Sequence, residues 1–294
     1  MVKTKPVVVV IIVTYNSQRF ITDCLQSVVS QSYPYKEIWV VDNGSWDNTL
    51  NIISQYPEIK VITNDKNIGV CAARNQVIKL SDGDYFLTLD CDAVLDKNYI
   101  TRLIEVAENL PFKYGMFWGK TLSLRDKNRI DTLGIYLSRF FRFYDWGQCK
   151  TSQEVNYIPE KILAPCACAA LYKRKMLEEI TEDGYCFDPK FHYLIEDFDI
   201  AIRAKQKGWK GKYVEDAISY HYRHGSGFDK KYIRYLSFKN RYYLLKKHCK
   251  IKDIPFLILS AFFYDLPRFL YLMVSSPQFT MKAIKEIWRW IKKN

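Results

Sequence analysis

One apolar run near the start of the chain limits the possible folds more than any other feature. Val7 to Val13 reads Val-Val-Val-Val-Ile-Ile-Val, so every residue in it is β-branched. A continuous run of this kind predicts a strand that is covered on both faces, as in a parallel sheet. Apolar residues then recur at helical spacing from Phe20 to Val28, which predicts a helix with Ser17 as its N-cap.

Strands and helices continue to alternate over the first 90 residues. Further strands are predicted at 37–41, 59–62 and 85–89, with helices at 47–56 and 70–80 between them. This alternation predicts an α/β fold with a mainly parallel sheet and helices on both faces. In such a sheet, ligands bind outside the carboxyl ends of the strands.

Three of the predicted strands end in polar residues, in the segments 14–16, 42–43 and 90–92. The last segment holds Asp90 and Asp92, one residue apart. Two carboxylates at a strand end suit Mg²⁺ or Mn²⁺, ions that commonly also hold substrate phosphates. A polar loop without a metal is the alternative.

Other residues near these strand ends suit a nucleotide. Asp42 can accept hydrogen bonds from a base or a ribose hydroxyl. The turn at Asn67 and Gly69, with Arg74 and Asn75 near the start of a helix, suits a diphosphate. A surface ion pair is the alternative for Arg74. The sequence contains neither a G-x-G-x-x-G after the first strand nor a P-loop, which disfavours dinucleotide and P-loop binding.

Four segments in this order resemble the signatures of family 2 glycosyltransferases with the GT-A fold. They are Val-Thr-Tyr-Asn at 13–16, Val-Asp-Asn-Gly-Ser-x-Asp-x-Thr at 41–49, Asn-x-Gly-x-x-x-x-Arg-Asn at 67–75 and Leu-Asp-x-Asp at 89–92. The resemblance covers roughly residues 7 to 225. It implies a nucleotide-sugar donor, a divalent cation on the D-x-D motif, and a single displacement that inverts the anomeric carbon.

The resemblance also implies roles for individual residues. Thr14, Tyr15 and Asn16 would line the donor pocket beside Asp42. His221 would complete the metal site, with His224 as the alternative ligand. Arg223 and the loop 225–227 would hold the donor diphosphate.

A second carboxylate pair, Glu196 and Asp197, precedes a helical pattern that ends near Gly208. N-capping is one explanation for acidic residues at a helix start. The other is general base catalysis, because transfer of a sugar to a hydroxyl requires removal of the hydroxyl proton. The segment resembles the Glu-Asp motif of the family, which implies Asp197 as the base and Glu196 as a neighbour that positions the acceptor.

The middle of the chain is less informative. The charged turn at 125–129 and the Ile-Asp-x-x-Gly segment that follows resemble the rhamnosyltransferase-like branch of the family, and we assign them no chemistry. Aromatic residues at 140–146 indicate either an acceptor lip or satellite core. The small residues at 164–170 would let a ligand approach the backbone, although relatives have a glycine where this chain has Ala and Cys.

The last 66 residues are strongly basic. Of the net charge of +12, +11 lies after position 228, where 15 Lys and Arg face four Asp and Glu. We therefore predict a transferase domain at 1–228 and a basic, amphipathic helical region at 229–294. The apolar stretch 254–274 is long enough to span a bilayer, but its central Asp-x-Pro-Arg favours two short interfacial helices.

The segment 281–293 has the pattern of an interfacial anchor or, equally, of a helix packed on the domain with a basic outer face. An anionic membrane surface is thus the expected partner, and nucleic acid is disfavoured because no binding module accompanies the charge. The start of the chain has no secretory signal pattern, and its eight cysteines show no zinc-like spacing. These two features predict a reduced, cytoplasmic protein, and the basic tail predicts that it is peripheral to the membrane.

The expected function is transfer of a sugar to a hydroxyl of a glycan or lipid-linked acceptor, in cell-surface polysaccharide synthesis. An inactive nucleotide-sugar-binding scaffold and a nucleotidyltransferase are the alternatives.

Overall fold

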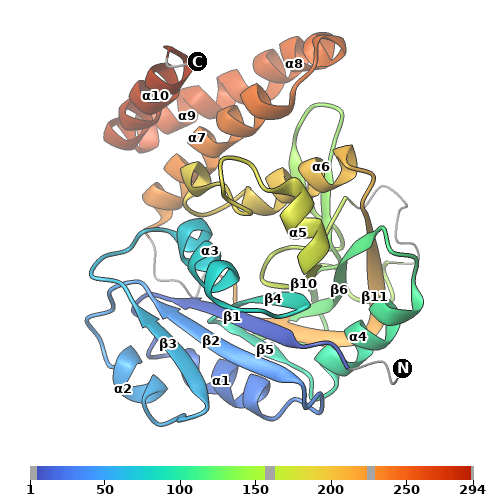
Figure 1. Cartoon of the computed structure of the whole chain (residues 1–294). Helices are drawn as coiled ribbons and strands as arrows, with labels where there is room; N and C mark the ends of the chain where they lie inside the picture. Colours follow the sequence, from blue (N-terminus) through green and yellow to red (C-terminus); the bar gives the residue numbers. More distant parts are fainter. Residues whose placement is uncertain (1–4, 156–162, 224–228, 293–294) are drawn as a thin grey trace.

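A mixed sheet of nine strands forms the centre of the part of the chain that the computed structural model describes, which comprises residues 5–155, 163–223 and 229–292 (Figure 1). The strand order is β3-β2-β1-β4-β10-β6-β11-β5, with β7 paired to β6, and β8 and β9 form a separate hairpin. The strands are β1 Val8–Thr14, β2 Lys36–Asp42, β3 Ile59–Thr63, β4 Tyr85–Asp90, β5 Ala93–Leu95, β6 Tyr114–Ser123, β7 Ile130–Thr132, β8 Ile135–Leu137, β9 Phe143–Asp145, β10 Ala169–Lys173 and β11 Lys210–His221.

Helices cover both faces of this sheet and extend beyond it at the C-terminal end (Figure 1). The α-helices are α1 Ile21–Val29, α2 Thr49–Ile53, α3 Val70–Leu80, α4 Tyr99–Asn109, α5 Arg174–Ile180, α6 Glu196–Gln206, α7 Lys230–His248, α8 Ile254–Ser260, α9 Leu266–Ser275 and α10 Pro277–Lys292. Short helical turns occur at η1 Pro189–Phe191, η2 Ile251–Asp253 and η3 Ala261–Asp265.

The predicted α/β fold is confirmed, and the first four strands lie within one residue of their predicted positions. β1 is parallel to both β2 and β4, and β2 is parallel to β3. Two local predictions are wrong. Ser17 is not the N-cap of α1, because its carbonyl, and not its hydroxyl, accepts from the backbone N–H groups of Phe20 and Ile21. The second helix is only five residues long.

The sheet departs from parallel order in its second half. β10 lies between β4 and β6 and is antiparallel to both. β11 is parallel to β6, and its register against β6 shifts between Tyr213 and Ile218. The residues between these two positions also belong to β11, so the strand continues through the register shift.

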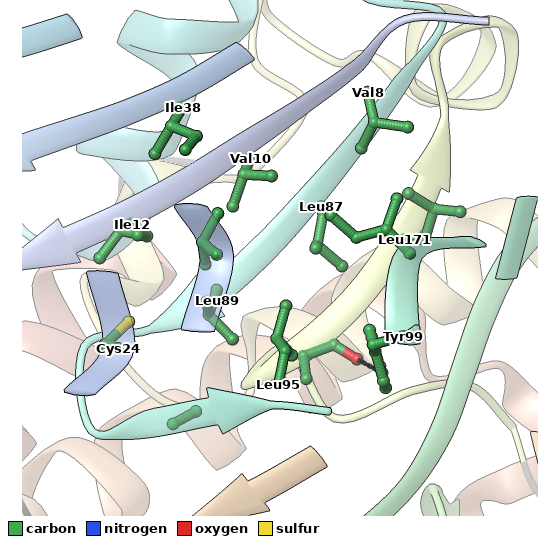
Figure 2. Packing of buried hydrophobic residues seen from close by; sticks show 14 of the residues in the cluster. Val8, Val10, Ile12, Cys24, Ile38, Leu87, Leu89, Leu95, Tyr99 and Leu171 are labelled. Carbon is green, nitrogen blue, oxygen red and sulfur yellow. Dashed lines mark hydrogen bonds between the residues drawn. The ribbon is translucent and has the colours of Figure 1, made fainter. Parts of the chain in front are cut away.

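Alternation along β1 divides the core into two layers. Val8, Val10 and Ile12 pack with α1 and α4 on one face of the sheet (Figure 2). Val9 and Ile11 pack with α3, α5 and α6 on the other face. All five side chains are completely buried. The uninterrupted β-branched run is therefore explained by a strand in the middle of the sheet with helices on both sides.

The C-terminal helices form a third apolar cluster, and they lie at the end of the molecule away from α1 and α2 (Figure 1). α10 packs on α7, where the rings of Tyr243 and Trp290 are 4.5 Å apart and Lys246 donates to the Trp290 carbonyl. For the last segment, the structure thus favours the packed helix over the interfacial anchor.

The expectation of two short helices at 254–274 is met by α8 and α9, but the two are not separate. Residues 251–275 are helical throughout, with η3, a π-helical turn, at Ala261–Asp265. By length and composition, this is the one helix in the described part of the chain that is long and apolar enough to cross a membrane.

Helix α7 also supports the loop that leads into α6. The Asn240 side-chain amide is completely buried and donates to the carbonyls of Phe191, Tyr193 and Leu194, each at 2.8 Å. A buried side chain with three such bonds fixes the course of the loop, and hence the position at which Glu196 and Asp197 begin their helix.

Candidate active site

The polar ends of β1, β2 and β4 lie side by side. Thr14 pairs with Asp42 across β1 and β2, and Val13 pairs with Asp90 across β1 and β4. β11 ends in the same region, because His221 pairs with Ala93, the residue after Asp92. The expectation that these strand ends share one edge of the sheet is confirmed.

The first pocket at this edge is lined by part of the predicted donor site, although Asp42 is not among its lining residues. Its lining includes Val13, Thr14, Tyr15, Asn43, Asn67, Gly69, Asp90, Asp92, His192 and Tyr193. Within the described residues, two buried oxygens here, Thr14 Oγ1 and Asp42 Oδ1, have no hydrogen-bond partner. The other oxygen of Asp42 accepts from the backbone N–H groups of Gly44 and Ser45. Because buried polar atoms are rarely left unpaired, these two oxygens indicate a ligand that donates hydrogen bonds.

Gly69 brings its backbone very close to His192. Its φ is +90°, and a Cβ at this position would lie 2.4 Å from His192 Nδ1. The Asn67 side chain accepts from the Gly69 N–H and so holds the turn. A glycine is therefore required both by conformation and by space. His192 and Tyr193 also line the pocket, although no motif in the sequence points to them, because the loop that Asn240 supports carries them there.

Two predicted donor-binding residues make structural hydrogen bonds. The Asn16 side chain accepts from the Trp46 N–H at 2.9 Å and braces two loops. Asn75 is buried, donates to the Phe187 carbonyl and accepts from the Phe187 N–H, so both of its polar atoms are occupied. Neither residue lines the first pocket, and their contact with the donor stays a prediction.

The three predicted metal ligands meet at one point. His221 Nε2 lies 3.2 Å from Asp92 Oδ1 and 3.9 Å from Asp90 Oδ2. One ligand atom from each residue fits within 4.8 Å of the others. Two carboxylates and an imidazole are suitable ligands for Mn²⁺ and, through the oxygens, for Mg²⁺. His224 and the loop 225–227 lie outside the described residues.

The charges at this point are strongly coupled. Burial raises the pKa of Asp90 to about 6, although the charges of Arg74 and His221 oppose this. Burial would lower the pKa of His221, but hydrogen bonds with Asp131 and Asp92 raise it well above its usual value. Two carboxylates around a raised-pKa imidazole make a site that attracts a positive charge.

The opposite side of the His221 ring contacts a residue to which the sequence assigned no chemistry. Asp131, on β7, places Oδ2 2.9 Å from His221 Nδ1. Its Oδ1 accepts from Arg223 Nε at 2.6 Å, and Arg223 also pairs with Asp145 at 2.9 Å. Burial opposes a low pKa at Asp131, but the hydrogen bond from His221 and the charge of Arg223 lower it. Arg223 lines the cleft with its charge already shared by two carboxylates, and its contact with the diphosphate stays a prediction.

Arg74 is an internal bridge, so the alternative of a surface ion pair is wrong. Its side chain is 2% exposed and donates to Glu196 Oε1 at 2.9 Å and to Asp90 Oδ1 at 3.2 Å. It also donates to the Ala167 carbonyl. One guanidinium thus joins a predicted metal ligand to the residue beside the predicted base. The second oxygen of Glu196 is buried without a partner among the described residues.

Asp197 lines a second cleft, of about 390 Å³, together with two of the three predicted metal ligands. Asp90, His221, Arg74, Glu196 and Asp197 all line this cleft, together with the small residues 166–168 and the aromatic residues Phe143 and Tyr144. Burial raises the pKa of Asp197 well above its usual value, and the charges of Glu196 and Asp145 add to this effect. A carboxylate with a raised pKa is a stronger base when it is ionised.

Comparisons with known proteins agree with this architecture. The model of the family described as "Glycosyl transferase family 2" matches residues 9–181. An N-acetylglucosaminyltransferase of Mesorhizobium japonicum is 29% identical over 223 residues, which are 73% of this chain and 51% of the relative. A putative teichuronic acid biosynthesis glycosyltransferase of Bacillus subtilis, TuaG, is 32% identical over 135 residues, 45% of this chain and 53% of the relative.

A solved structure shares the fold along nearly the whole chain. The mannosyltransferase PcManGT from Pyrobaculum calidifontis, solved with GDP-Man and Mn²⁺, matches with a TM-score of 0.57 and 18% identity over 96% of this chain and 74% of that one. By contrast, the chain spans about half the length of the curated relatives just described.

Proposed function

The chain belongs to glycosyl transferase family 2, and we propose that it is an inverting, metal-dependent glycosyltransferase. It transfers a sugar from a nucleotide-diphosphate donor to a hydroxyl of a glycan or lipid-linked acceptor, in the synthesis of a cell-surface polysaccharide. The Bacillus relative named for teichuronic acid biosynthesis supports the polysaccharide. The GDP-Man and Mn²⁺ bound to the mannosyltransferase of the same fold support the donor class and the cation.

One observation carries the proposal. Asp90, Asp92 and His221, which are up to 131 positions apart in the chain, converge within a few ångströms, and Asp197 lines the same cleft. General base catalysis with a metal-bound diphosphate requires this arrangement, with the base and the cation on the two sides of the reacting carbon. Asp197 is on α6, whereas Asp90 ends β4 and His221 ends β11. Contacts within a single element therefore do not account for the cleft that they share.

The residues present fit the cation. The carboxylates of Asp90 and Asp92 and the imidazole Nε2 of His221 would hold Mn²⁺ or Mg²⁺. When bound, the ion supplies positive charge that neutralises the diphosphate as it leaves. Thr14 and Asp42 hold the nucleoside through the two oxygens that lack partners.

The remaining chemistry belongs to Asp197. Its carboxylate accepts the proton of the acceptor hydroxyl while that oxygen bonds to the anomeric carbon and the bond to the diphosphate breaks. The Phe198 N–H donates to Asp197 Oδ1 at 2.9 Å, which orients the carboxylate. Arg74 forms an ion pair with the carboxylate of Glu196. This pair keeps the Glu196 carboxylate separate from that of Asp197.

Two substitutions separate donor binding from catalysis. We expect Asp92→Ala and Asp197→Ala each to abolish sugar transfer, whereas only Asp197→Ala retains nucleotide-sugar affinity in the presence of Mn²⁺. A thermal-shift screen of nucleotide sugars with Mn²⁺ or Mg²⁺ identifies the donor, and calorimetry then measures its affinity in both variants.

The conservative variant Asp197→Asn tests the base itself. It keeps the size of the side chain and loses the basic oxygen, so transfer to the native acceptor should fall at least a thousandfold, in line with the usual contribution of a general base. Full activity of Asp197→Asn would refute the assignment. Donor binding by the wild-type chain without transfer to any of a broad panel of acceptors would refute the transferase and favour a binding scaffold.

A further inference from the structure

The helical segment 251–275 has an outer face that is entirely uncharged. Between positions 254 and 274, every exposed residue is apolar, a tyrosine or a proline. The exposed members are Ile254, Pro255, Ile258, Leu259, Ala261, Phe262, Phe263, Leu266, Pro267, Leu270, Tyr271 and Val274. Phe262 is 64% exposed, Phe263 73% and Val274 86%. This set, here called the outer face, is a contiguous stripe because its members recur at spacings of three and four residues. Stripes of this size are uncommon on proteins that expose them only to water.

The two charged residues in the middle of the segment, Asp265 and Arg268, point inward. Asp265 is 6% exposed and pairs with Arg241 of α7, which is completely buried, at 2.6 Å. Ser260 donates to Asp265 and accepts from Arg241. Arg268 donates to Ser237 of α7. The central Asp-x-Pro-Arg, which argued against contact with lipid in the sequence, is therefore satisfied by α7 and does not reach the outer face.

A rim of positive charge borders the outer face. Lys250 and Lys252 are exposed at its start. Arg139 and Arg142, from the turn between β8 and β9, are also exposed and lie over the rings of Phe256 and Tyr264. Phe140 in the same turn contacts Phe256, with ring centroids 5.9 Å apart. The only other carboxylate of the segment, Asp253, accepts from the Lys250 backbone N–H.

We propose that the outer face docks onto the surface of an anionic lipid bilayer, with the segment 251–275 lying in the plane of the membrane. The apolar stripe enters the boundary between headgroups and acyl chains, and the four basic residues of the rim contact anionic headgroups. The charge complementarity of this rim selects an anionic bilayer as the occupant.

An in-plane orientation follows from the inner face of the segment. To cross the bilayer, the helix would have to leave α7, which would place Asp265 in hydrocarbon and leave Arg241 buried without its partner. Docking in the plane breaks none of these contacts. The turn at 139–142 belongs to the hairpin whose Phe143 and Tyr144 line the catalytic cleft, and this hairpin extends toward α8 (Figure 1). Docking therefore also places that cleft near the membrane surface.

The docking does not depend on the proposed transferase activity, and each can fail without the other. Vesicle binding is measured without donor or acceptor, and donor binding is measured without vesicles.

Co-sedimentation of the full chain with vesicles tests the proposal directly. The probe is a set of vesicles of phosphatidylcholine with 30% phosphatidylglycerol, compared with vesicles of phosphatidylcholine alone. We expect sedimentation with the anionic vesicles, and at least about tenfold weaker partitioning for the double variant Phe262→Ser/Phe263→Ser, because it removes two exposed aromatic rings from the apolar stripe. The charge variant Arg139→Gln/Lys252→Gln should weaken binding several-fold and remove most of its salt dependence.

The matched control is Leu80→Ser/Phe112→Ser, which removes two exposed apolar side chains of similar size from other parts of the surface. It should sediment like the wild type, and circular dichroism should show all variants folded. Wild-type binding by Phe262→Ser/Phe263→Ser would overturn the proposal. The proposal would also be overturned if the chain does not bind vesicles but forms a dimer that the same substitutions dissociate. In that case a second copy of the chain would cover the outer face.

Discussion

His221 Nδ1 lies 2.9 Å from Asp131 Oδ2, on the side of the ring opposite Asp92. This contact holds Nδ1 of His221 in a hydrogen bond with Asp131 and turns Nε2 toward Asp90 and Asp92, where a bound cation would take the place of the Nε2 proton. A carboxylate behind a histidine ligand is a common means of fixing its tautomer and its orientation. Asp131 is therefore a positioning residue for the proposed metal site.

Replacement of Asp131 tests this role. We expect Asp131→Asn to weaken Mn²⁺ binding about 10- to 100-fold, because the amide can present N–H to the imidazole and favour the wrong tautomer. Isothermal titration with Mn²⁺ measures the affinity. Asp126→Asn, in the exposed turn of the same segment, is the control and should bind as the wild type does. Unchanged affinity in Asp131→Asn would show that His221 needs no partner.

We expect substitution of Arg74 to reduce the stability of the fold more directly than the affinity for the donor. Arg74→Met leaves Asp90 and Glu196 without their shared cation, and we expect a loss of about 3–5 kcal/mol in the free energy of unfolding. Urea denaturation measures this loss. The control Lys60→Met breaks an exposed pair with Glu37 and should cost less than about 1 kcal/mol. Unchanged stability together with weaker nucleotide binding would instead support the direct diphosphate contact predicted from the sequence.

The unpaired hydroxyl of Thr14 predicts an unusual combination of effects. Thr14→Val removes a buried oxygen that has no partner in the described structure, so the free energy of unfolding should stay within about 1 kcal/mol of the wild type. Donor affinity should fall about fivefold to tenfold, because one hydrogen bond to the nucleotide is lost.

Thr132→Val is the matched control for Thr14→Val. The Thr132 hydroxyl is buried, accepts from the Gly134 N–H and donates to the Gly134 carbonyl. This substitution should therefore destabilise the fold by about 1–3 kcal/mol and leave donor affinity intact. Equal donor affinity in Thr14→Val and the wild type would exclude Thr14 from the donor site.

Asp199 predicts a pH-dependent part of the stability. It is completely buried and pairs with Arg203, Lys247 and His248 at 2.7–2.9 Å. Burial would raise its pKa, but the hydrogen bond from His248 and the charges of Arg203 and Lys247 hold the pKa far below its usual value.

A carboxyl whose folded pKa is lowered stabilises the fold above its unfolded pKa of about 3.9 and loses this effect as the pH falls toward the folded pKa. The deficit of Asp199→Asn in urea unfolding should thus be about 3–5 kcal/mol at pH 7 and shrink below about pH 4. A deficit that is constant from pH 7 to pH 3 would contradict this. Glu215→Gln, at an exposed pair with Lys120, should show no such trend.

The fold and part of the site were predictable because their signals are local. The β-branched run at 8–13 predicts a central strand, and the spacing of apolar residues predicts α3 with both ends correct. The carboxylates Asp90 and Asp92 follow β4, and parallel strands end at one edge, so their proximity to Thr14 and Asp42 could be inferred without coordinates.

The sequence failed where a side chain can choose between partners. Ser17 looks like an N-cap, but its hydroxyl contacts Tyr15 and Cys91 instead. Arg74 looks like a surface or phosphate-binding cation, but two distant carboxylates enclose it. The apolar stretch near position 265 looks broken by charge, but α7 satisfies that charge and the helix continues.

The order of strands and helices, the two-sided burial of β1 and the carboxylates at the strand ends were determined by the sequence alone, since periodicity and strand ends depend on neighbouring residues. Only the tertiary structure decided that Asp131 supports His221, 90 positions away, and that Arg74 joins Asp90 to Glu196. It also decided that Asp265 and Arg268 turn toward α7. Such contacts depend on which surfaces meet when the chain folds, and no local pattern records the partner across that distance.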